Sequence, residues 1–329
     1  MSIVSPDTSF TTMAPVCPGI YLHNRGGTCQ PISMALRAIS WTGNWSQNVL
    51  PSSSRVPNCS APLARTGRRA HFSSSAKIIR CDMKRDPQVL ETWSMEEAYD
   101  ALAYRLLETA RTIGPREKYI VGIAGPPGAG KSTVAYEVVG RLNKLWREER
   151  SELNETPDIS VAVPMDGFHL YRWQLDAMED PAEAHARRGA PWTFDPVKLV
   201  DSLKTLRKKG SVCLPSFDHG VGDPVEDDVY VEDWHKVVVV EGNYLLLKEG
   251  AWNDLGGMFD ERWFVDVDLD EAMRRVERRH VLTGKPPEIA KRRVAHNDRP
   301  NAELIQQSRW NADLWIQSIP LTVSDPVIT

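Results

Sequence analysis

The sequence predicts a doubly wound α/β fold, in which helices flank a mainly parallel β-sheet. Two observations support this prediction. Apolar stretches of strand length alternate with helical patterns along most of the chain, and four consecutive valines at 237–240 have the character of a central strand buried on both faces. Ligands of such sheets bind beyond the carboxyl ends of the strands, so the residues that follow each strand are the candidates for function.

Residues 125–132, Gly-Pro-Pro-Gly-Ala-Gly-Lys-Ser, fit the phosphate-binding pattern G-x-x-x-x-G-K-[ST]. The apolar run 119–123 precedes them, and apolar residues at helical spacing follow as far as Trp146. This order of strand, glycine-rich loop and helix suits a polyphosphate, because glycines allow close backbone approach and a helix N-terminus offers free N–H groups. The sequence therefore predicts a P-loop NTPase fold.

The phosphate loop supplies the candidate contacts for a nucleotide. Lys131 would place a positive charge at the β- and γ-phosphates, and the Ser132 hydroxyl can ligate Mg²⁺. The expected cofactors are therefore ATP and Mg²⁺. The candidate contacts are Gly125, Pro126, Pro127, Gly128, Ala129, Gly130, Lys131, Ser132 and Thr133.

Length and charge narrow the class of protein. With 329 residues, of which 41% are apolar, the chain can build a substantial core. Its apolar runs fall short of the roughly 18 residues that a membrane span needs, so no membrane partner is expected. The formal net charge is −4, but residues 1–81 carry +7 and the remainder −11. An acidic body argues against nucleic acid as a partner.

Residues 1–81 are rich in serine and threonine, contain Asp7 as their only acidic residue, and lack the apolar core of a secretory signal. This composition predicts an organellar transit peptide, with the chloroplast as the expected destination and the mitochondrion as the alternative. A disordered basic tail is the other interpretation. Residues 82–329 would then form the catalytic domain. Cys213, in an apolar run, is expected in its core rather than in a disulfide or zinc site.

Local periodicity predicts the helices and strands. Residues 95–111 place Ala98, Leu102, Leu106 and Ala110 on one helical face. Further helical patterns lie at 132–147, 196–209, 270–283 and 301–317. Strands are expected at 119–123, 159–163, 212–214, 237–240, 263–267 and 320–323.

Two acidic residues follow expected strands. Asp166 comes after 159–163, where a carboxylate could accept the proton of an attacking hydroxyl or cap a helix N-terminus, and the residues alone leave both open. Glu241 comes directly after the four valines. A carboxylate at the end of a buried strand needs a cation to offset its desolvation, so Glu241 is the candidate Mg²⁺-binding acid.

Three connecting segments have a distinctive composition. Residues 187–195 and 215–223 mix aromatic with polar side chains, which suits a pocket for a small polyhydroxy molecule but also an ordinary surface loop. Residues 274–293 hold eight lysines and arginines around Gly284-Lys285-Pro286-Pro287, which predicts a hinged basic helix pair closing over phosphates. A nucleic-acid patch and solvated helices are the alternatives for this segment.

Together these motifs resemble the phosphoribulokinase/uridine kinase-like P-loop kinases, a family that includes pantothenate kinase and a bacterial fructose-kinase-like branch. The resemblance covers about residues 95–317 and is greatest to uridine-kinase-like plant proteins. It rests on the segments GPPGAGKST at 125–133, MDGF at 165–168, RRG at 187–189, FDH at 217–219, EG at 241–242, RRH at 278–280 and NDRPN at 297–301.

The resemblance implies roles for individual residues. It implies that Asp166 is the general base and Glu241 the acid of a Walker B motif, so the catalytic candidates are Lys131, Asp166 and Glu241. Ser132 and Glu241 are the implied metal ligands. The substrate-side residues that it implies are His169, Arg188, Asp218 and His219.

The resemblance also implies that Arg279 begins a lid over the nucleotide and that Asn297 lies near the adenine. One departure affects the substrate. The chain has Asp-Gly-Phe at 166–168 where uridine kinase has Asp-Ser-Phe-Tyr, which argues against uridine as the phosphate acceptor.

The sequence thus predicts an ATP-dependent, Mg²⁺-requiring phosphotransferase that acts on a hydroxyl of a small metabolite, such as a sugar, a nucleoside or a pantothenate-like molecule. A homodimer is left open. The alternatives are a nucleotide-hydrolysing switch or ATPase and a regulatory nucleotide-binding protein. A GTPase would need Asn-Lys-x-Asp, and the one Asn-Lys pair, Asn143-Lys144-Leu145-Trp146, lacks the aspartate.

Overall fold

The computed structural model describes residues 86–152, 156–218 and 220–319, which all belong to one compact unit, Ile78–Thr329. The predicted transit peptide at 1–81, the strand expected at 320–323 and the candidate His219 lie outside the described residues. In the described part of the chain, no helix is long and apolar enough to cross a membrane.

The centre of the molecule is a six-stranded parallel sheet, which confirms the predicted α/β fold class. At its centre, Val121 pairs with Val239 of one neighbouring strand and with Glu261 of the other. In spatial order the strands are β1 (Gln88–Leu90), β8 (Leu314–Gln317), β7 (Glu261–Asp266), β2 (Tyr119–Ala124), β6 (Val237–Glu241) and β3 (Ser160–Pro164).

The four valines of β6 show why this strand lies in the middle. Val237 and Val239 pack into the core on one side of the sheet, and Val238 and Val240 pack into the core on the other side. All four side chains are fully buried. Because successive side chains of a strand point to opposite faces, only a strand covered on both sides can bury an unbroken run of valines.

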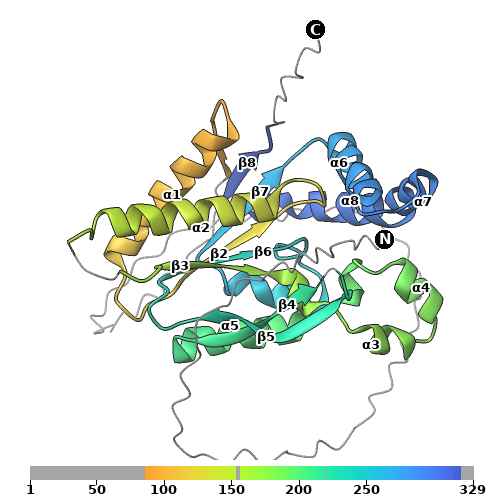
Figure 1. Cartoon of the computed structure of the whole chain (residues 1–329), viewed down its shortest axis with the longest axis horizontal. Coiled ribbons are helices and arrows are strands. Elements are labelled where there is room, and N and C mark those ends of the chain that lie inside the picture. Colours follow the sequence, from red (N-terminus) through yellow and green to blue (C-terminus); the bar gives the residue numbers. More distant parts are fainter. Residues whose placement is uncertain (1–85, 153–155, 219, 320–329) are drawn as a thin grey trace, which may run out of the picture. The chain divides into compact units, whose positions relative to one another are not determined.

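Helices cover both faces of the sheet (Figure 1). On one face lie α1 (Met95–Thr112) and α2 (Lys131–Glu148), and on the other lies α5 (Pro196–Lys209). The predicted helices at 95–111, 132–147 and 196–209 are therefore confirmed. Polar caps set where α1 and α5 begin: the Ser94 side chain accepts a hydrogen bond from the Glu97 amide, and the Asp195 side chain accepts one from the Lys198 amide.

A β-hairpin forms a second, two-stranded sheet from β4 (Val212–Asp218) and β5 (Asp223–Val231). The strand predicted at 212–214 is thus confirmed, but it pairs antiparallel with β5 instead of joining the main sheet. The expectation for Cys213 is wrong, because its side chain is exposed. Its neighbour Leu214 is buried against the core, so the alternation along the strand decides which of the two points inward.

The segments between β3 and α5 and after β7 are helical and gather at one end of the molecule (Figure 1). The first group contains η1 (Met165–Phe168), α3 (Arg172–Asp176), α4 (Pro181–Ala186) and η2 (Pro191–Thr193). The second contains α6 (Leu269–Leu282), α7 (Pro287–Arg293), the π-helix η4 (Val294–Asp298), α8 (Arg299–Gln307) and η5 (Ser308–Asn311). The 3₁₀-helix η3 (Gly250–Gly257) follows β6.

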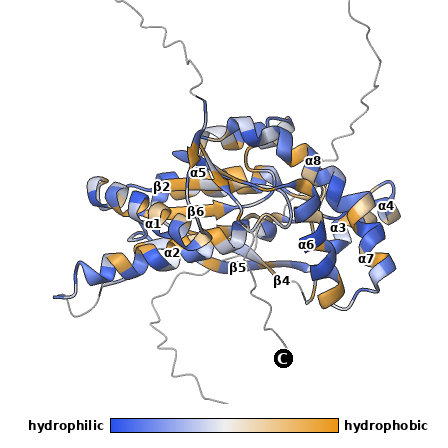
Figure 2. Ribbon diagram, turned by 90° about the horizontal axis from the view of Figure 1, so that it is seen from above, coloured by the Kyte–Doolittle hydropathy of each residue, from blue (hydrophilic) through white to orange (hydrophobic). Residues whose placement is uncertain are grey.

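The basic segment forms the two helices that its sequence predicts, α6 and α7, separated at Gly284. Figure 2 shows α6 as largely hydrophilic, in contrast to the hydrophobic strands β2 and β6. The helix expected at 301–317 is wrong in its last part. Residues 314–317 form β8, because the apolar and β-branched residues Leu314, Trp315 and Ile316 pair with both β7 and β1.

Candidate active site

The phosphate loop lies between β2 and α2, at the carboxyl end of the sheet. Gly128 adopts a left-handed conformation with a φ of 83°, and a Cβ at this position would lie 2.5 Å from the carbonyl oxygen of Ala272 in α6. The glycine therefore allows the loop and α6 to touch. Arg275, one turn further along α6, donates hydrogen bonds to the Gly128 carbonyl at 3.3 Å and to Ser318 Oγ at 3.0 Å.

A cavity of about 340 Å³ opens over this loop. It brings together the three catalytic candidates from three different strand ends, with two arginines of the predicted basic lid segment beside them. The lining residues are Pro127, Gly128, Gly130, Lys131, Ser132, Thr133, Asp166, Glu241, Gly242, Asn243, Arg275 and Arg279.

Lys131 is the first residue of α2, and its side chain is buried. Its ammonium group donates a hydrogen bond of 3.2 Å to the carbonyl of Pro126 in the loop. Burial lowers the pKa of Lys131, while the negative charges of Glu241 and Asp166 act in the opposite direction. A phosphate in the cavity would add negative charge beside this ammonium and so favour its charged form.

Glu241 is the last residue of β6 and is buried. Its Oε1 accepts a hydrogen bond of 3.0 Å from Ser132 Oγ. Burial raises the pKa of Glu241, and Lys131 opposes this shift. The two oxygens fit a magnesium ion, which binds hard oxygen ligands and in nucleotide sites takes one or two carboxylates with the phosphates supplying others. The chain thus provides the protein ligands that such a site needs.

Asp166 lies in η1, directly after β3, and lines the same cavity. The alternative reading of Asp166 as a helix cap finds no support among the described residues, because η1 begins after Pro164 and has no side-chain cap hydrogen bond. Close packing against β4 requires a glycine at the next position, 167. A Cβ there would overlap the carbonyl oxygen of Pro215 in β4, so η1 and the hairpin touch backbone to backbone.

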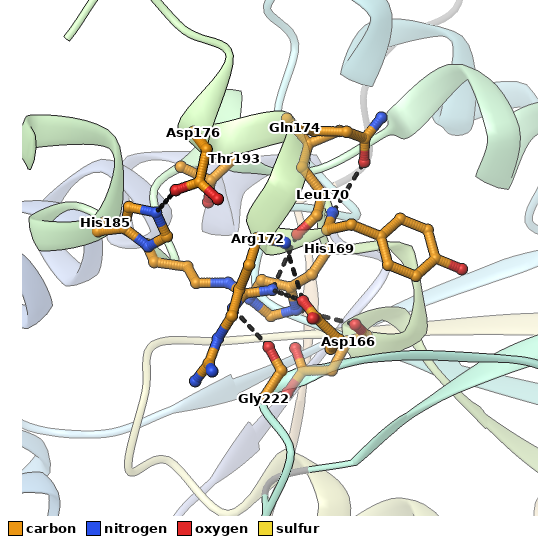
Figure 3. A network of polar contacts seen from close by, with 12 residues as sticks. Asp166, His169, Leu170, Arg172, Gln174, Asp176, His185, Thr193 and Gly222 are labelled. Atoms are coloured by element: carbon orange, nitrogen blue, oxygen red, sulfur yellow. Dashed lines mark hydrogen bonds and ion pairs between the residues drawn. The ribbon is translucent and has the colours of Figure 1, made fainter. Parts of the chain in front are cut away.

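Of the remaining substrate-side candidates, His169 lies next to Asp166 (Figure 3). The ring of His169 packs against Phe194 and Phe217 at centroid distances of 3.9 and 4.6 Å, and its Nδ1 lies 2.8 Å from the Asp166 carbonyl oxygen. Asp218 is exposed, and its Oδ1 accepts hydrogen bonds from the amides of Gly220 and Val221 at the hairpin tip. The structure thus places Asp218 at the end of β4, where its side chain holds the first amides of the turn.

Arg188 and Asn297 make their hydrogen bonds with other parts of the protein. The guanidinium of Arg188 donates to backbone carbonyls and to Asp223, within the protein. Asn297 is buried, and its amide bonds to Arg187 and Arg188 rather than facing the phosphate loop. Arg279, in contrast, lines the phosphate cavity as the lid prediction requires.

A second cavity, of about 390 Å³, lies on the other side of the phosphate loop and shares Gly128, Gly130, Thr133 and Arg275 with the first. Sequence reasoning missed it because its walls come from α1, α6 and the residues after β8, which are remote in the chain. The residues particular to it are Met95, Tyr99, Ala129, Glu271, Arg278, Ser318 and Ile319. The only available signal was Arg278, next to Arg279 in the basic segment.

The sequence and the fold are similar to those of known proteins. Residues 120–324 match the Phosphoribulokinase / Uridine kinase family. The chain is 36% identical to "Putative uridine kinase C227.14" of Schizosaccharomyces pombe, over 68% of this chain and 92% of that protein. It is 31% identical to the ATP-dependent kinase YFH7 of Kluyveromyces lactis, over 54% of this chain and 62% of that protein, and so spans less than two thirds of this second relative.

A solved structure agrees with these sequence matches. The crystal structure of a "putative fructose transport system kinase" from Silicibacter sp. TM1040 superimposes with a TM-score of 0.56 and 30% identity, over 66% of this chain and 98% of that one. The predicted resemblance is thereby confirmed. Because the family match extends over more than half of the sequence, the chain belongs to the phosphoribulokinase/uridine kinase family of P-loop kinases.

Proposed function

We propose that the protein is an ATP-dependent, Mg²⁺-requiring phosphotransferase that acts on a hydroxyl of a small metabolite. The observation that supports this most directly is the shared cavity of Lys131, Asp166 and Glu241. These residues lie at the carboxyl ends of β2, β3 and β6, three adjacent parallel strands, at the edge of the sheet where ligands of α/β folds bind. A cation, a base and a metal-binding acid are the groups that phosphoryl transfer needs.

The nucleotide fits the two cavities that meet at the phosphate loop. The loop amides, Lys131 and Arg279 would hold the phosphates, whose charge grows on the equatorial oxygens as the phosphoryl group moves. The nucleoside would occupy the second cavity, which Tyr99 and Arg278 help to line. This assignment replaces Asn297 as the residue expected near the adenine.

The metal would be held by Ser132 Oγ and Glu241, which already lie 3.0 Å apart. In the described part of the chain, no group of three or more His, Cys, Asp or Glu side chains could hold a metal ion by itself. A magnesium ion here would therefore complete its shell with phosphate oxygens and water, as it usually does at nucleotide sites. When bound, it would neutralise phosphate charge.

Asp166 is the proposed general base. Its position in η1 sets it at the wall shared by the phosphate cavity and the hairpin β4–β5. An acceptor hydroxyl lying between them could hand its proton to the carboxylate as the oxygen attacks the γ-phosphorus, and the phosphoryl bond to ADP would break in line with that attack.

The names of two relatives refer to different compounds: one names uridine, a nucleoside, and the other a fructose transport system. The half-buried rings of His169 and Phe217, which pack against each other beside the buried Phe194, would suit the apolar face of a polyhydroxy molecule. We therefore propose a sugar, nucleoside or pantothenate-like acceptor, without a further choice among them.

The test is a transfer assay with the full chain. Radiolabelled γ-phosphoryl ATP and Mg²⁺ are incubated with panels of nucleosides, sugars, glycerate and pantothenate, and label in organic product is separated from label in inorganic phosphate. Label in one acceptor, lost in Lys131→Ala, supports the proposal. Label in inorganic phosphate alone, unaffected by any acceptor, would favour the nucleotide-hydrolysing ATPase instead. A protein that binds no ATP would overturn both.

A further inference from the structure

Asn297 is a buried hub in the π-helix η4. Its side chain is 2% exposed, and its amide uses both ends. Nδ2 donates a hydrogen bond of 3.1 Å to the carbonyl of Arg188, and Oδ1 accepts from Arg187 Nε and Asn301 Nδ2, each at 3.2 Å. If Asn297 shifts, its partners must shift with it, because each hydrogen bond that is lost leaves a buried polar group without a partner.

Arg188 faces two ways at once. Its backbone carbonyl accepts hydrogen bonds from Asn297 and from Arg293 Nη2 at 3.2 Å. Its guanidinium, 13% exposed, points toward the hairpin and donates to the Leu170 carbonyl at 2.8 Å, to Asp223 Oδ1 at 3.1 Å and to the Gly222 carbonyl. Leu170 and Gly222 flank this network in Figure 3. One residue thus joins η4 to the tip of the hairpin.

The residues next to Asn297 connect it to the phosphate cavity. Asp298, next to Asn297, makes a hydrogen bond of 2.9 Å through Oδ2 with His280 Nε2 in α6, and both side chains are largely buried. His280 directly follows Arg279, which lines the cavity over the phosphate loop. A continuous series of contacts therefore runs from Arg279 and His280 through Asp298 and Asn297 to Arg188 and the hairpin.

We propose that Asn297 and Arg188 are positioning residues that couple the nucleotide site to the acceptor hairpin, a proposal that builds on the function proposed above. A nucleotide drawing Arg279 onto its phosphates would bias the position of α6, and the buried contacts would carry that bias to η4, to segment 187–189 and to Gly222–Asp223. Because such coupling is reciprocal, an acceptor held against the hairpin would in turn favour the lid position that binds the nucleotide.

The hairpin tip offers a readout that needs no knowledge of the acceptor. The amides of Gly220, Val221 and Gly222 all donate to Asp218, so their hydrogen exchange reports how often this turn opens. Exchange is measured by mass spectrometry on the full chain, with Mg²⁺ and with or without a non-hydrolysable imido analogue of ATP. In the wild-type protein we expect the analogue to slow exchange at this tip about five-fold or more.

Two variants test the series of contacts. Asn297→Asp preserves size and the acceptor for Arg187 but replaces the donor to the Arg188 carbonyl with an oxygen. Arg188→Lys leaves that carbonyl in place and removes the guanidinium that spans Leu170 and Gly222. We expect each to bind the analogue within about three-fold of wild type, yet to lose the nucleotide-dependent slowing at the tip, consistent with the size of typical coupling energies.

His296→Ala is the matched control, because His296 is exposed on the same helix and its Nδ1 contacts only the Arg292 carbonyl of its own turn among the described contacts. It should behave as wild type. A merely structural role would raise exchange equally with and without nucleotide, so the difference between the two states would survive. Slowing of the tip that persists in both variants, or is absent in a wild-type protein that binds the analogue, refutes the coupling alone. Failure of the wild type to bind the analogue refutes the proposed function instead.

Discussion

Ser132 Oγ donates a hydrogen bond of 3.0 Å to Glu241 Oε1, although the two residues are 109 positions apart. Ser132 lies in the first turn of α2 and Glu241 ends β6, and parallel pairing of β2 with β6 brings these two positions to the same edge of the sheet. The contact joins the phosphate loop to the acid after the valines, so the two groups proposed to share a metal are already in place in the protein alone.

Lys131→Ala should lower kcat by about 10²–10³-fold or more, because a charge aimed at the moving phosphoryl group contributes most in the transition state. The fold should persist, since the lysine makes one hydrogen bond, of 3.2 Å, to Pro126. Steady-state kinetics and circular dichroism check the two parts. Lys144→Ala is the control, because this exposed lysine of the same helix pairs only weakly, at 3.9 Å, with Glu148. A folded Lys131→Ala protein with unchanged turnover would be incompatible with the proposed site.

Asp166→Asn and Glu241→Gln should separate proton transfer from metal binding. The first keeps shape but removes the basic oxygen, so kcat should fall by about 10²–10⁴-fold with the magnesium requirement unchanged. The second should shift the magnesium concentration that gives half activity, because it removes the anionic ligand. Magnesium titrations at saturating ATP measure both. The opposite pattern would show that the two roles are assigned the wrong way round.

The magnesium requirement should also depend on pH through Glu241. Burial raises the pKa of this carboxyl, so a proton competes with the metal at pH values where an exposed glutamate is already ionised. The half-saturating magnesium concentration should therefore rise as the pH falls through the raised pKa and level off above it. Glu241→Gln should flatten this dependence, apart from the part due to ATP itself, which a titration without protein measures. A slope that is identical in both proteins would contradict the assignment.

Gly167→Ala should destabilise the protein by about 1–3 kcal/mol, because the added methyl group overlaps the Pro215 carbonyl oxygen and must push the hairpin from η1. Thermal unfolding measures the loss. Gly140→Ala serves as the counterpart: a Cβ there, in the middle of α2, meets nothing within 4 Å, and the change should stabilise by about 0.4–1 kcal/mol. Equal effects at the two glycines would rule out the backbone contact as the cause.

Local sequence patterns were enough to predict those parts of the fold whose residues fit one kind of structure. The phosphate loop and the four valines of β6 predicted the parallel sheet, and the rule on strand ends placed Asp166 and Glu241 at one edge before their contacts were known. The helix predicted at 301–317 failed over 314–317 because tertiary pairing with β7 overrides local propensity.

The substrate side was harder to predict for a physical reason. Arg188 and Asn297 are polar residues in polar segments, and nothing in the sequence tells whether such groups face a ligand or one another. Arg188 donates to the carbonyl of Gly222, and Asn297 donates to the carbonyl of Arg188. In both cases the acceptor is a backbone carbonyl on another element, and since every residue has a carbonyl, the sequence does not single out the partner. The second cavity was missed for the same reason, since Tyr99 and Ser318 meet only after folding.

The hairpin β4–β5 stands apart from the main sheet, since its two strands pair with each other in a sheet of their own. β4 still packs against η1 at Pro215, and Leu214 and Val231 are buried in the core. The exposed positions of β5, by contrast, can diverge without disturbing the register of β2, β6 and β3, on which the phosphate loop and both acids depend. Under the function proposed above, exchanging these exposed positions between family members, with Arg188 retained as the anchor of the hairpin, should change the acceptor and leave Lys131, Asp166 and Glu241 in place.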